Sequence, residues 1–454
     1  MLTNLSFERF KSWKRIAEMR LAPITALFGT NSSGKTSVLQ LLLMLKQTAE
    51  SSDRAQTLNL GDDRALVNLG TVRDLVYRHE LPASIKWALA WTLPKKMEVA
   101  DPEQKRAVLF ADSALRFEAQ VAGNGSGPIR VSRFAYHFAD HDFVIRRKSP
   151  AEEKYQLFAQ PEDFHFKRTR GRAWDLPAPV KCYGFPDQVR AYYQNAGFLS
   201  DLELAFEELF ARTYYLGPLR EYPKREYTWA GAQPADMGRR GELAIAALLA
   251  SRDRGEKISR GKGVKRLTLE EYVAWWLREL GLIHRFRVEP ISKDGNLYQV
   301  RVQQAPGAPE VLITDVGFGV SQILPVLALC YYVPEGSIIL MEQPEIHLHP
   351  SVQAGLADVL IDAARIRGVQ IIIESHSEHL LRRLQRRVAE EKIQSDEVAL
   401  YFCNMDEGTS QLTHLELDLF GRIANWPKDF FGDEFGEIAA MTEAAMGRKQ
   451  QAQR

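Results

Sequence analysis

The chain has 454 residues and a mass of 51.6 kDa, which is enough for about three domains of ordinary size. Hydrophobic residues make up 45% and charged residues 26%, so the composition excludes a disordered or collagen-like chain. Lysine and arginine total 59 and aspartate and glutamate total 58, which leaves a net charge of +1. No overall basic field therefore points to nucleic acid, although a local basic surface is compatible with this balance.

Cysteine usage and hydropathy exclude two further classes of protein. Cys182, Cys330 and Cys403 lie far apart and form no CxxC pair, so neither a zinc ribbon nor a disulfide framework is predicted. The first residues are polar throughout and lack the apolar core of a signal peptide. The longest apolar run, about Ile323–Val333, is shorter than the roughly 20 residues that span a bilayer. We therefore expect a cytoplasmic protein without a membrane partner.

The N-terminal half divides into two regions of different composition. Residues 2–28 contain two candidate strands, ending in Ile24–Phe28, and an apolar helix follows a glycine-bearing loop and runs to about Thr48. From about Leu81 to Tyr215, aromatic and β-branched stretches alternate with turn-forming breaks. This second pattern predicts an inserted β-rich lobe.

The C-terminal half predicts strands and helices in alternation. An amphipathic helix is expected at Leu267–Leu280, and the strands Arg285–Glu289 and Leu297–Val302 flank the hairpin turn Lys293–Asn296. From Val311 onward, short apolar strands alternate with helices, which predicts an α/β fold with a parallel sheet covered on both faces. The expected elements are helices at 321–333, 351–367 and 378–391 and strands at 337–342 and 369–374.

The strongest motif is the sequence GTNSSGKT, from Gly29 to Thr36, which fits the phosphate-binding pattern G-x-x-x-x-G-K-[ST]. Its glycines let successive backbone N–H groups face a phosphate, Lys35 neutralises phosphate oxygens, and Thr36 offers a hydroxyl to Mg²⁺. The helix that begins here directs its positive end at the same anion. The residues predicted to bind ATP are Gly29, Asn31, Ser32, Ser33, Gly34, Lys35, Thr36 and Ser37.

Three further motifs follow along the chain. The apolar strand before Glu342 delivers a carboxylate to a sheet edge, where it can hold Mg²⁺ for phosphoryl transfer. The sequence GFGVS, with Gly317, Gly319 and Ser321, precedes a helix and can form an anion-binding nest or a plain turn. The strand Ile371–Glu374 ends in a Ser-His sequence, which favours a site role for His376.

Together these motifs resemble those of the ABC-type ATPase heads, most closely the RecF, SMC and overcoming-lysogenization-defect (OLD) group, which includes prokaryotic antiviral-defence ATPases. The segments Leu216–Gly231 and Trp426–Glu437 also resemble this prokaryotic branch. The resemblance covers about residues 1–50 and 214–437. It implies an ABC-type P-loop ATPase head with an inserted lobe and a short C-terminal extension. The expected divisions are 1–80, 81–215, 216–420 and 421–454.

The resemblance also implies a role for each motif. Lys35 and Thr36 would hold phosphate and Mg²⁺, Glu342 would coordinate Mg²⁺, and His376 would sense the γ-phosphate. Gly317, Gly319 and Ser321 would form the signature that touches the nucleotide of a second protomer. The loop His347–Pro350 would join the two protomers.

Two positions depart from the family pattern. Gln343 occupies the place of the water-activating carboxylate, and an amide can orient water but cannot accept its proton. Glu345, two residues on, is the alternative base. The glutamine that contacts Mg²⁺ in this family has no clear counterpart, since Gln47 lies about three turns, roughly 18 Å, into the first helix.

The function implied by the resemblance is ATP binding and slow hydrolysis that control assembly of an antiviral-defence complex. Its partners would be a second copy of the chain and a separate effector, a nuclease or toxin, because no second catalytic cluster is visible in the sequence. An aromatic tail containing Trp426, Phe430, Phe431 and Phe435 suits docking, or else caps the sheet. The alternatives are a RecF-like repair ATPase that binds DNA and a non-hydrolysing scaffold that dimerises with ATP. Arg220 and Arg225 are interpreted as surface ion pairs, with a contact to the γ-phosphate or to a partner as the alternative.

Overall fold

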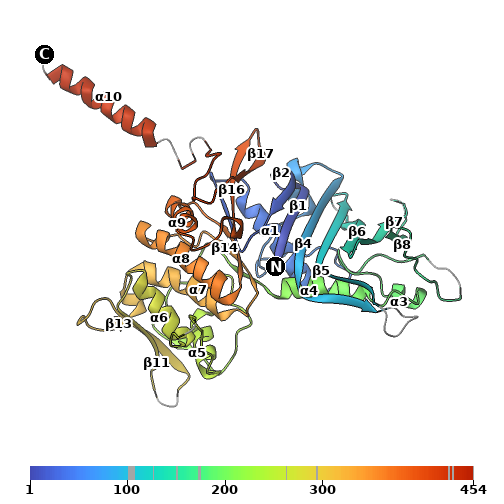
Figure 1. Ribbon diagram of the computed structural model, residues 1–454, viewed down its shortest axis with the longest axis horizontal. Coiled ribbons are helices and arrows are strands. Elements are labelled where there is room, and N and C mark those ends of the chain that lie inside the picture. The colour runs from blue at the N-terminus through green and yellow to red at the C-terminus, as the bar shows by residue number, and fades with distance from the viewer. Residues whose placement is uncertain are drawn as a thin grey trace.

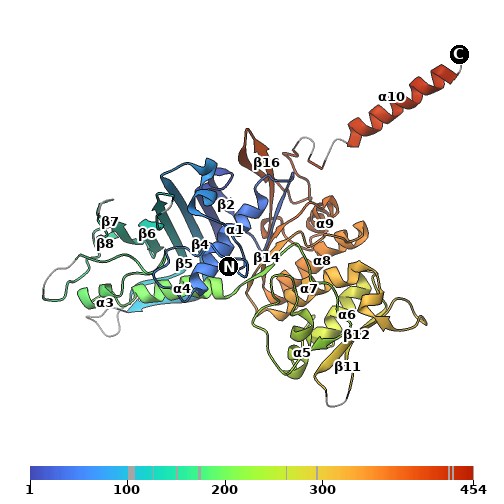
Figure 2. The same cartoon turned by 180° about the vertical axis from the view of Figure 1, so that it is seen from behind.

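Two large sheets organise the molecule and lie side by side, with the N-terminus between them and α10 projecting away from the body (Figures 1 and 2). The computed structural model describes residues 1–100, 108–125, 127–149, 152–171, 175–261, 263–292, 295–427, 430–431 and 434–452. No helix in these ranges is long and apolar enough to cross a bilayer.

The first sheet is antiparallel and has seven strands. In spatial order these are β2 (Trp13–Arg20), β1 (Leu2–Phe10), β4 (Ala83–Ala100), β5 (Val108–Gly123), β6 (Arg130–Phe138), β7 (His141–Arg147) and β8 (Tyr155–Gln160). The region expected to form an inserted lobe supplies β4 to β8. These strands continue directly from β1, which pairs with β4 from Leu2 opposite Trp91 to Glu8 opposite Lys86. The expected boundary at residue 81 therefore falls within one continuous sheet.

The prediction of two strands in residues 2–28 is wrong, because this segment forms three. Phe10 pairs with Trp13 across a tight turn at Lys11 and Ser12, and β3 (Ile24–Gly29) follows as a separate strand. The backbone of Lys11 adopts a φ of +50°, which a lysine rarely does. No glycine, proline or asparagine marks this turn, so the sequence pattern did not predict it.

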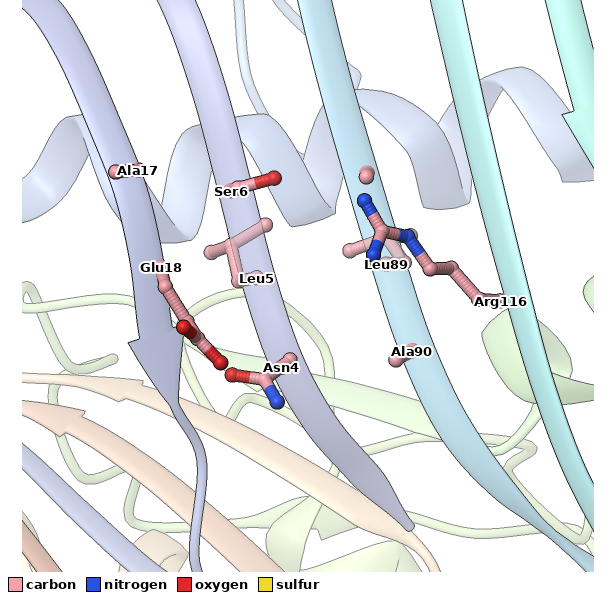
Figure 3. Close-up of a pocket in the computed structure, with 9 residues that line it drawn as sticks. Asn4, Leu5, Ser6, Ala17, Glu18, Leu89, Ala90 and Arg116 are labelled. Atoms are coloured by element: carbon pink, nitrogen blue, oxygen red, sulfur yellow. The ribbon is translucent and has the colours of Figure 1, made fainter. Parts of the chain in front are cut away.

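The two faces of the seven-stranded sheet differ in polarity. The inner face buries large rings such as Trp87, Phe117 and Phe134 against the helices α1 (Lys35–Glu50) and α4 (Leu199–Ala211). The outer face carries small and polar side chains, and Figure 3 shows Asn4 and Arg116 beside a shallow pocket of about 190 Å³ on it. This face therefore contributes little to the core.

The second sheet has six strands and a parallel centre. In spatial order these are β17 (Thr409–Leu415), β16 (Val398–Asp406), β3, β15 (Gln370–Glu374), β14 (Ile338–Glu342) and β9 (Thr213–Leu216), and β17 alone is antiparallel to its neighbour. Ile338 and Leu340 of β14 pack into one core, whereas Ile339 and Met341 pack into the other. The prediction of a parallel sheet covered on both faces is confirmed. The strands β16 and β17 were not predicted.

Helices cover the second sheet and connect its strands. The helix predicted at 321–333 begins earlier, because the extended Gly317 (φ −58°, ψ 151°) ends the preceding chain and Phe318 already lies in the first turn. This helix is α7 (Phe318–Tyr332). The other helices of the described residues, besides α1 and α4, are α2 (Val72–Leu75), α3 (Gln188–Tyr192), α5 (Ala244–Asp253), α6 (Leu269–Glu279), α8 (Pro350–Arg367), α9 (Glu378–Ala389) and α10 (Glu434–Ala452). Short 3-10 turns lie at Tyr77–His79, Ile313–Asp315 and Ser395–Glu397.

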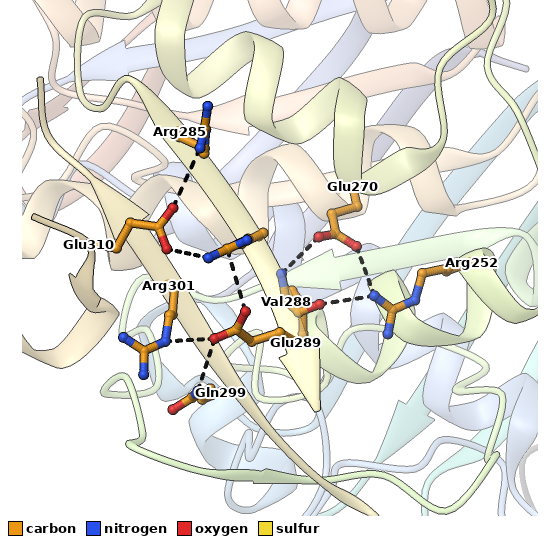
Figure 4. A network of polar contacts seen from close by, with 9 residues as sticks. Arg252, Glu270, Arg285, Val288, Glu289, Gln299, Arg301 and Glu310 are labelled. Carbon is orange, nitrogen blue, oxygen red and sulfur yellow. Dashed lines mark hydrogen bonds and ion pairs between the residues drawn. The ribbon is translucent and has the colours of Figure 1, made fainter. Parts of the chain in front are cut away.

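A small sheet packs on α6 and contains the predicted hairpin. Its strands are β10 (Tyr227–Thr228), β11 (Arg285–Pro290), β12 (Leu297–Gln303) and β13 (Val311–Leu312), and the turn residues Lys293 and Asp294 lie outside the described residues. Polar contacts tie the hairpin to its neighbours (Figure 4). The backbone N–H of Val288 donates to Glu270 at 2.8 Å, and Arg252 donates to the Val288 carbonyl at 2.9 Å.

Part of the aromatic tail belongs to the core. Phe430 is buried, and its ring centroid lies 6.1 Å from that of Phe28 and 4.8 Å from that of Phe402. Phe431 lies 6.3 Å from Phe28. These two rings cap the sheet instead of forming a docking face, and the side chain of Phe435 lies outside the described residues.

Candidate functional site

A glycine-bearing loop connects β3 to α1 at the carboxyl edge of the six-stranded sheet. Gly29 has a φ of +142°, and a Cβ there would lie 1.9 Å from the Cys403 carbonyl oxygen. Gly34 has a φ of +89°, and a Cβ there would lie 2.5 Å from Ser410 Oγ. Only glycine fits these positions, because other residues would clash and be strained. The loop also contains Asn31, Ser32 and Ser33, whereas Ser37 is buried in the first turn of α1.

The side chain of Lys35 lies inside this loop. Its Nζ donates hydrogen bonds to the carbonyl oxygens of Thr30 at 2.7 Å and Gly29 at 3.1 Å. Burial lowers the pKa of Lys35, and the carboxylate of Glu374 opposes this shift. The positive end of α1 points to the same place, so the loop concentrates positive potential where a phosphate would bind.

Thr36 makes a contact that the sequence did not indicate. Its hydroxyl donates a hydrogen bond of 2.7 Å to Glu374 Oε2 at the end of β15. Glu374 is also the register partner of Glu342 on the neighbouring parallel strand β14. One hydroxyl and two buried carboxylates therefore meet at this edge of the sheet.

The chemistry of these three side chains fits Mg²⁺. Mg²⁺ takes oxygen ligands and is commonly held by one or two carboxylates together with substrate phosphates. Thr36, Glu342 and Glu374 offer such oxygen ligands. In the described part of the chain, no group of three or more His, Cys, Asp and Glu residues could hold a metal ion.

A buried polar cluster surrounds Glu342 on the other side of β14. The Tyr215 hydroxyl donates to Glu342 Oε1 at 2.8 Å, and burial raises the pKa of Glu342 to about 7. Arg220 is only 5% exposed, and burial lowers its pKa to about 10. Its Nη2 reaches the Glu342 carbonyl at 3.5 Å, while Nε and Nη1 have no hydrogen-bond partner among the described residues.

The interpretation of Arg220 as a surface ion pair is therefore wrong, because the guanidinium is enclosed beside the Glu342 strand. For Arg225 the interpretation is confirmed, since its exposed guanidinium pairs with Asp315 at 3.0 Å. A buried cation with unpaired donors is rare in proteins and commonly marks a functional site.

The two candidate water-activating residues occupy different environments. Gln343 is half-buried and has a φ of +43°, with its N–H donated to the Glu374 carbonyl at 2.8 Å. Glu345 is only 5% exposed, and its Oε1 accepts the backbone N–H of His376 at 2.7 Å. Its Oε2 has no partner among the described residues, and burial raises the pKa of Glu345.

The imidazole of His376 is exposed at the same edge. Burial of part of the ring lowers the pKa of His376, and the positive charge of Lys35 lowers it further. The structure thus brings five predicted site residues together at one sheet edge: Lys35, Thr36, Glu342, Glu345 and His376. The first and last of them are 341 positions apart in the sequence.

The predicted signature lies at a separate surface. Gly317 caps α7, and Ser321 Oγ donates to the Phe318 carbonyl at 2.8 Å within the first turn. A Cβ added at Gly317 would have no other atom within 4 Å. A Cβ added at Gly319 would lie 3.4 Å from a methyl carbon of Leu282. Among the described residues, no hydrogen bond or ion pair joins this motif to the phosphate loop.

Exposed aromatic side chains lie at the signature. Phe318, within the motif, is 50% exposed, and Tyr222 is 66% exposed. The rings of Tyr222 and Phe318 pack edge to face at 5.5 Å, and the ring of His347 lies 6.4 Å from that of Phe318. Beyond His347, the ring of His349 caps α8 by accepting the Ser351 N–H at 3.3 Å.

Gln47 has a structural role. Its side chain is buried and donates to the carbonyl oxygens of Asn59 at 2.7 Å and Val67 at 3.3 Å. It therefore secures the segment after α1, in agreement with the expectation that it lies too far along the helix to contact Mg²⁺.

Comparison with known families adds to this geometry. Residues 190–382 match a family described as "AAA domain, putative AbiEii toxin, Type IV TA system". This match includes Arg220, the signature, Glu342 and His376, and the phosphate loop precedes it. Residues 190–382 are therefore similar to an AAA-type ATPase domain, and the phosphate loop and parallel sheet of the chain agree with a P-loop ATPase. Residues 393–441 of this ATPase match a family described as a protein of unknown function, DUF3696.

Solved structures similar to the ATPase include several SMC heads. The SmcHead bound to the C-winged helix domain of ScpA is 12% identical, with a TM-score of 0.46 and coverage of 92% of this chain and 98% of that chain. The SMC head domain from Thermotoga maritima is 10% identical, with a TM-score of 0.41 and coverage of 91% and 99%. The Smc head with an extended coiled coil, bound to the C-terminal domain of ScpA derived from Pyrococcus furiosus, is 10% identical, with a TM-score of 0.45 and coverage of 92% and 96%. No curated protein matches the sequence.

Proposed function

We propose that this ATPase binds ATP with Mg²⁺ and hydrolyses it slowly, in the cytoplasm. The observation that carries the proposal is the placement of Lys35 inside the glycine loop with Thr36 bonded to Glu374 at 2.7 Å. Backbone N–H groups of the loop and Lys35 bind the phosphates, because both supply positive charge in an enclosed space. Thr36, Glu342 and Glu374 hold Mg²⁺, which when bound neutralises charge on the transferring phosphoryl group.

The slow rate follows in this proposal from the residues available to activate water. Gln343 can orient a water molecule but cannot accept a proton. Glu345 can accept one, and its free Oε2 is the acceptor that we assign to this step. His376 senses the γ-phosphate from the same edge. A carboxylate with a raised pKa is a competent base, and its burial limits the fraction that is ionised at lower pH.

A second copy of the chain completes the site in this proposal. Gly317, Gly319 and Ser321 form an anion-binding helix start that contacts the nucleotide of the partner protomer. The exposed rings of Tyr222 and Phe318 support an interface here, because burying exposed apolar groups against a partner removes them from water. Light scattering with ATP tests this: Phe318→Arg should abolish ATP-dependent dimers, and unchanged dimers would contradict it.

In this proposal the ATPase controls a separate effector protein, which is a nuclease or toxin of a prokaryotic antiviral-defence complex. The family description of residues 190–382, which refers to a toxin–antitoxin system, supports such a pairing. Co-expression with the neighbouring gene should change phage growth, and Lys35→Ala should remove the change. Nuclease activity of the purified chain that Lys35→Ala abolishes would contradict a separate effector.

A second candidate function is an ATP-dependent scaffold that does not hydrolyse. Gln343 favours this candidate, because an amide occupies the position next to the Mg²⁺ carboxylate. Single-turnover measurements separate the two. The scaffold predicts no phosphate release by the wild type over hours. Slow hydrolysis predicts phosphate release at a rate that depends on Glu345.

A further inference from the structure

The last strand of the seven-stranded sheet, β8, lies at the outer end of this sheet (Figure 1), and a groove follows it. It has a volume of about 690 Å³ and is lined by β8, by the end of β7 and by residues 162–168. Among the described residues, β8 pairs with β7 on one side, and its other edge makes a single bridge, between Tyr155 and Leu176. Exposed strand edges are usually covered or blocked in soluble proteins, so an open edge in a groove indicates an occupant.

Aromatic rings line this groove. Phe158, Phe164, Phe166 and Tyr193 are each half-buried, so part of every ring remains accessible. The centroids of Phe164 and Phe166 lie 5.1 Å apart, and those of Phe166 and Tyr193 lie 5.5 Å apart. Phe164, Phe166 and Tyr193 pack against the core, and the exposed part of each ring can stack on planar ligand groups.

The groove is also basic, although the whole chain is almost neutral. Arg146 and Arg168 line it and have no ion-pair partner among the described residues. His165 lines it as well, and Lys148 pairs with Asp175. Glu162 is the other carboxylate in the lining. The lining thus holds three cations and two carboxylates, and Arg146 and Arg168 are the two cations without an ion pair among the described residues, while Arg146 also donates hydrogen bonds to the side-chain oxygen of Gln156.

The fold holds these cations beside the rings. Arg146 lies over the ring of Phe158, with its guanidinium carbon 5.2 Å from the ring centroid. Arg168 belongs to a segment fixed by backbone hydrogen bonds, since Thr169 N–H donates to the Tyr192 carbonyl at 2.9 Å and Gln194 N–H to the Lys167 carbonyl at 2.8 Å. The basic runs at 146–148 and 167–170 are distant in sequence and meet only in the fold.

We propose that this groove binds single-stranded nucleic acid. Single strands are bound by positively charged grooves that follow the phosphates, combined with aromatic rings on which unpaired bases stack. A duplex keeps its bases stacked inside, and an acidic peptide uses the charge but has no planar bases for the rings. The combination of Arg146 and Arg168 with four accessible rings thus fits a single strand best. The proposal goes beyond ATP hydrolysis and does not depend on it.

Fluorescence anisotropy with a fluorescein-labelled 20-nucleotide oligo(dT) tests the proposal on the full chain without ATP. The wild type should bind it, with an affinity that falls as salt rises from 50 to 200 mM. Arg146→Glu combined with Arg168→Glu should weaken binding at least tenfold, because two phosphate contacts become repulsive. Phe158→Ala should weaken it about tenfold through lost stacking.

Matched controls separate the groove from general charge effects. Lys257→Glu combined with Arg266→Glu removes two exposed cations from the other half of the molecule and should leave the affinity within twofold. Thermal melting should be unchanged in all variants, since every altered side chain is at least partly exposed. No binding by the wild type, equal loss in both double variants, or tighter binding of a duplex or of poly-glutamate would overturn the proposal.

Discussion

Thr36 and Glu374 are joined by a hydrogen bond of 2.7 Å, although 338 positions separate them in the chain. The bond links the first turn of α1 to the end of β15, because β3 and β15 are neighbouring parallel strands. Glu374 therefore lies beside the hydroxyl that we assign to Mg²⁺, and we propose that its carboxylate also binds the ion.

Glu374→Gln should reduce hydrolysis at least tenfold and raise the Mg²⁺ concentration needed for half-maximal rate. The amide is nearly the same size but lacks the charge that attracts the cation. Glu378→Gln, four residues on in the exposed first turn of α9, is the matched control and should change neither quantity, because a surface ion pair contributes little. A Mg²⁺ titration decides, and identical curves for both variants and the wild type would remove Glu374 from the site.

The assignment of the base predicts opposite effects at two neighbouring positions. Glu345→Gln should lower the single-turnover rate at least a hundredfold, since it removes the only proton acceptor we assign. Gln343→Glu should raise the rate, because it adds a carboxylate at the more accessible position. Rates that neither substitution changes would contradict both assignments.

Arg220 should be costly to stability and needed for activity. Replacing a buried, poorly paired charge by an apolar residue of similar volume is often neutral or stabilising. Arg220→Met is therefore expected to keep or raise the melting temperature while hydrolysis falls at least tenfold. Arg225→Met, at the exposed ion pair with Asp315, should change neither. A parallel loss of stability and activity in Arg220→Met would instead indicate a structural role.

Several features of the site could be predicted from sequence because they are local. The phosphate loop and the strand ending in Glu342 each lie within about ten residues, and periodicity placed them on the correct elements. The contacts of Glu374, Tyr215 and Arg220 could not be predicted in this way. They depend on the order of strands β3, β15, β14 and β9 in the sheet, and no short pattern encodes this order.

The missed elements have similar causes. The turn at Lys11 and Ser12 carries no glycine, proline or asparagine, and so two strands were predicted as one. The boundary expected at residue 81 followed a change in composition, whereas the sheet is continuous because β1 pairs with β4. Strand pairing between distant segments leaves little trace in local composition.

Glu203 gives a pH-dependent test of the seven-stranded half. Burial against this half raises the pKa of Glu203 from its usual 4.5 to about 7, although its carboxylate accepts the Phe185 N–H. The folded state thus disfavours the charged form, and the resulting cost is present above about pH 7 and absent below about 4.5. Glu203→Gln should therefore raise the melting temperature at pH 8, by the equivalent of about 2 kcal/mol or less, and have no such effect at pH 4.5.

Thermal melting at the two pH values measures this difference. Glu208→Gln, an exposed position on the same helix, controls for the change in net charge. An equal gain for Glu203→Gln at both pH values would show that burial of the charge is not its cause.

Calorimetric titration of the wild type and of Lys35→Ala with MgATP tests the central claim most directly. Lys35 lies inside the loop, bonded to its carbonyl oxygens at 2.7 and 3.1 Å, so it is the cation placed to contact the phosphates. We predict that the wild type binds MgATP, that Lys35→Ala loses at least a hundredfold in affinity with an unchanged melting temperature, and that Lys257→Ala binds like the wild type. Equal affinity of a folded Lys35→Ala variant would contradict the account.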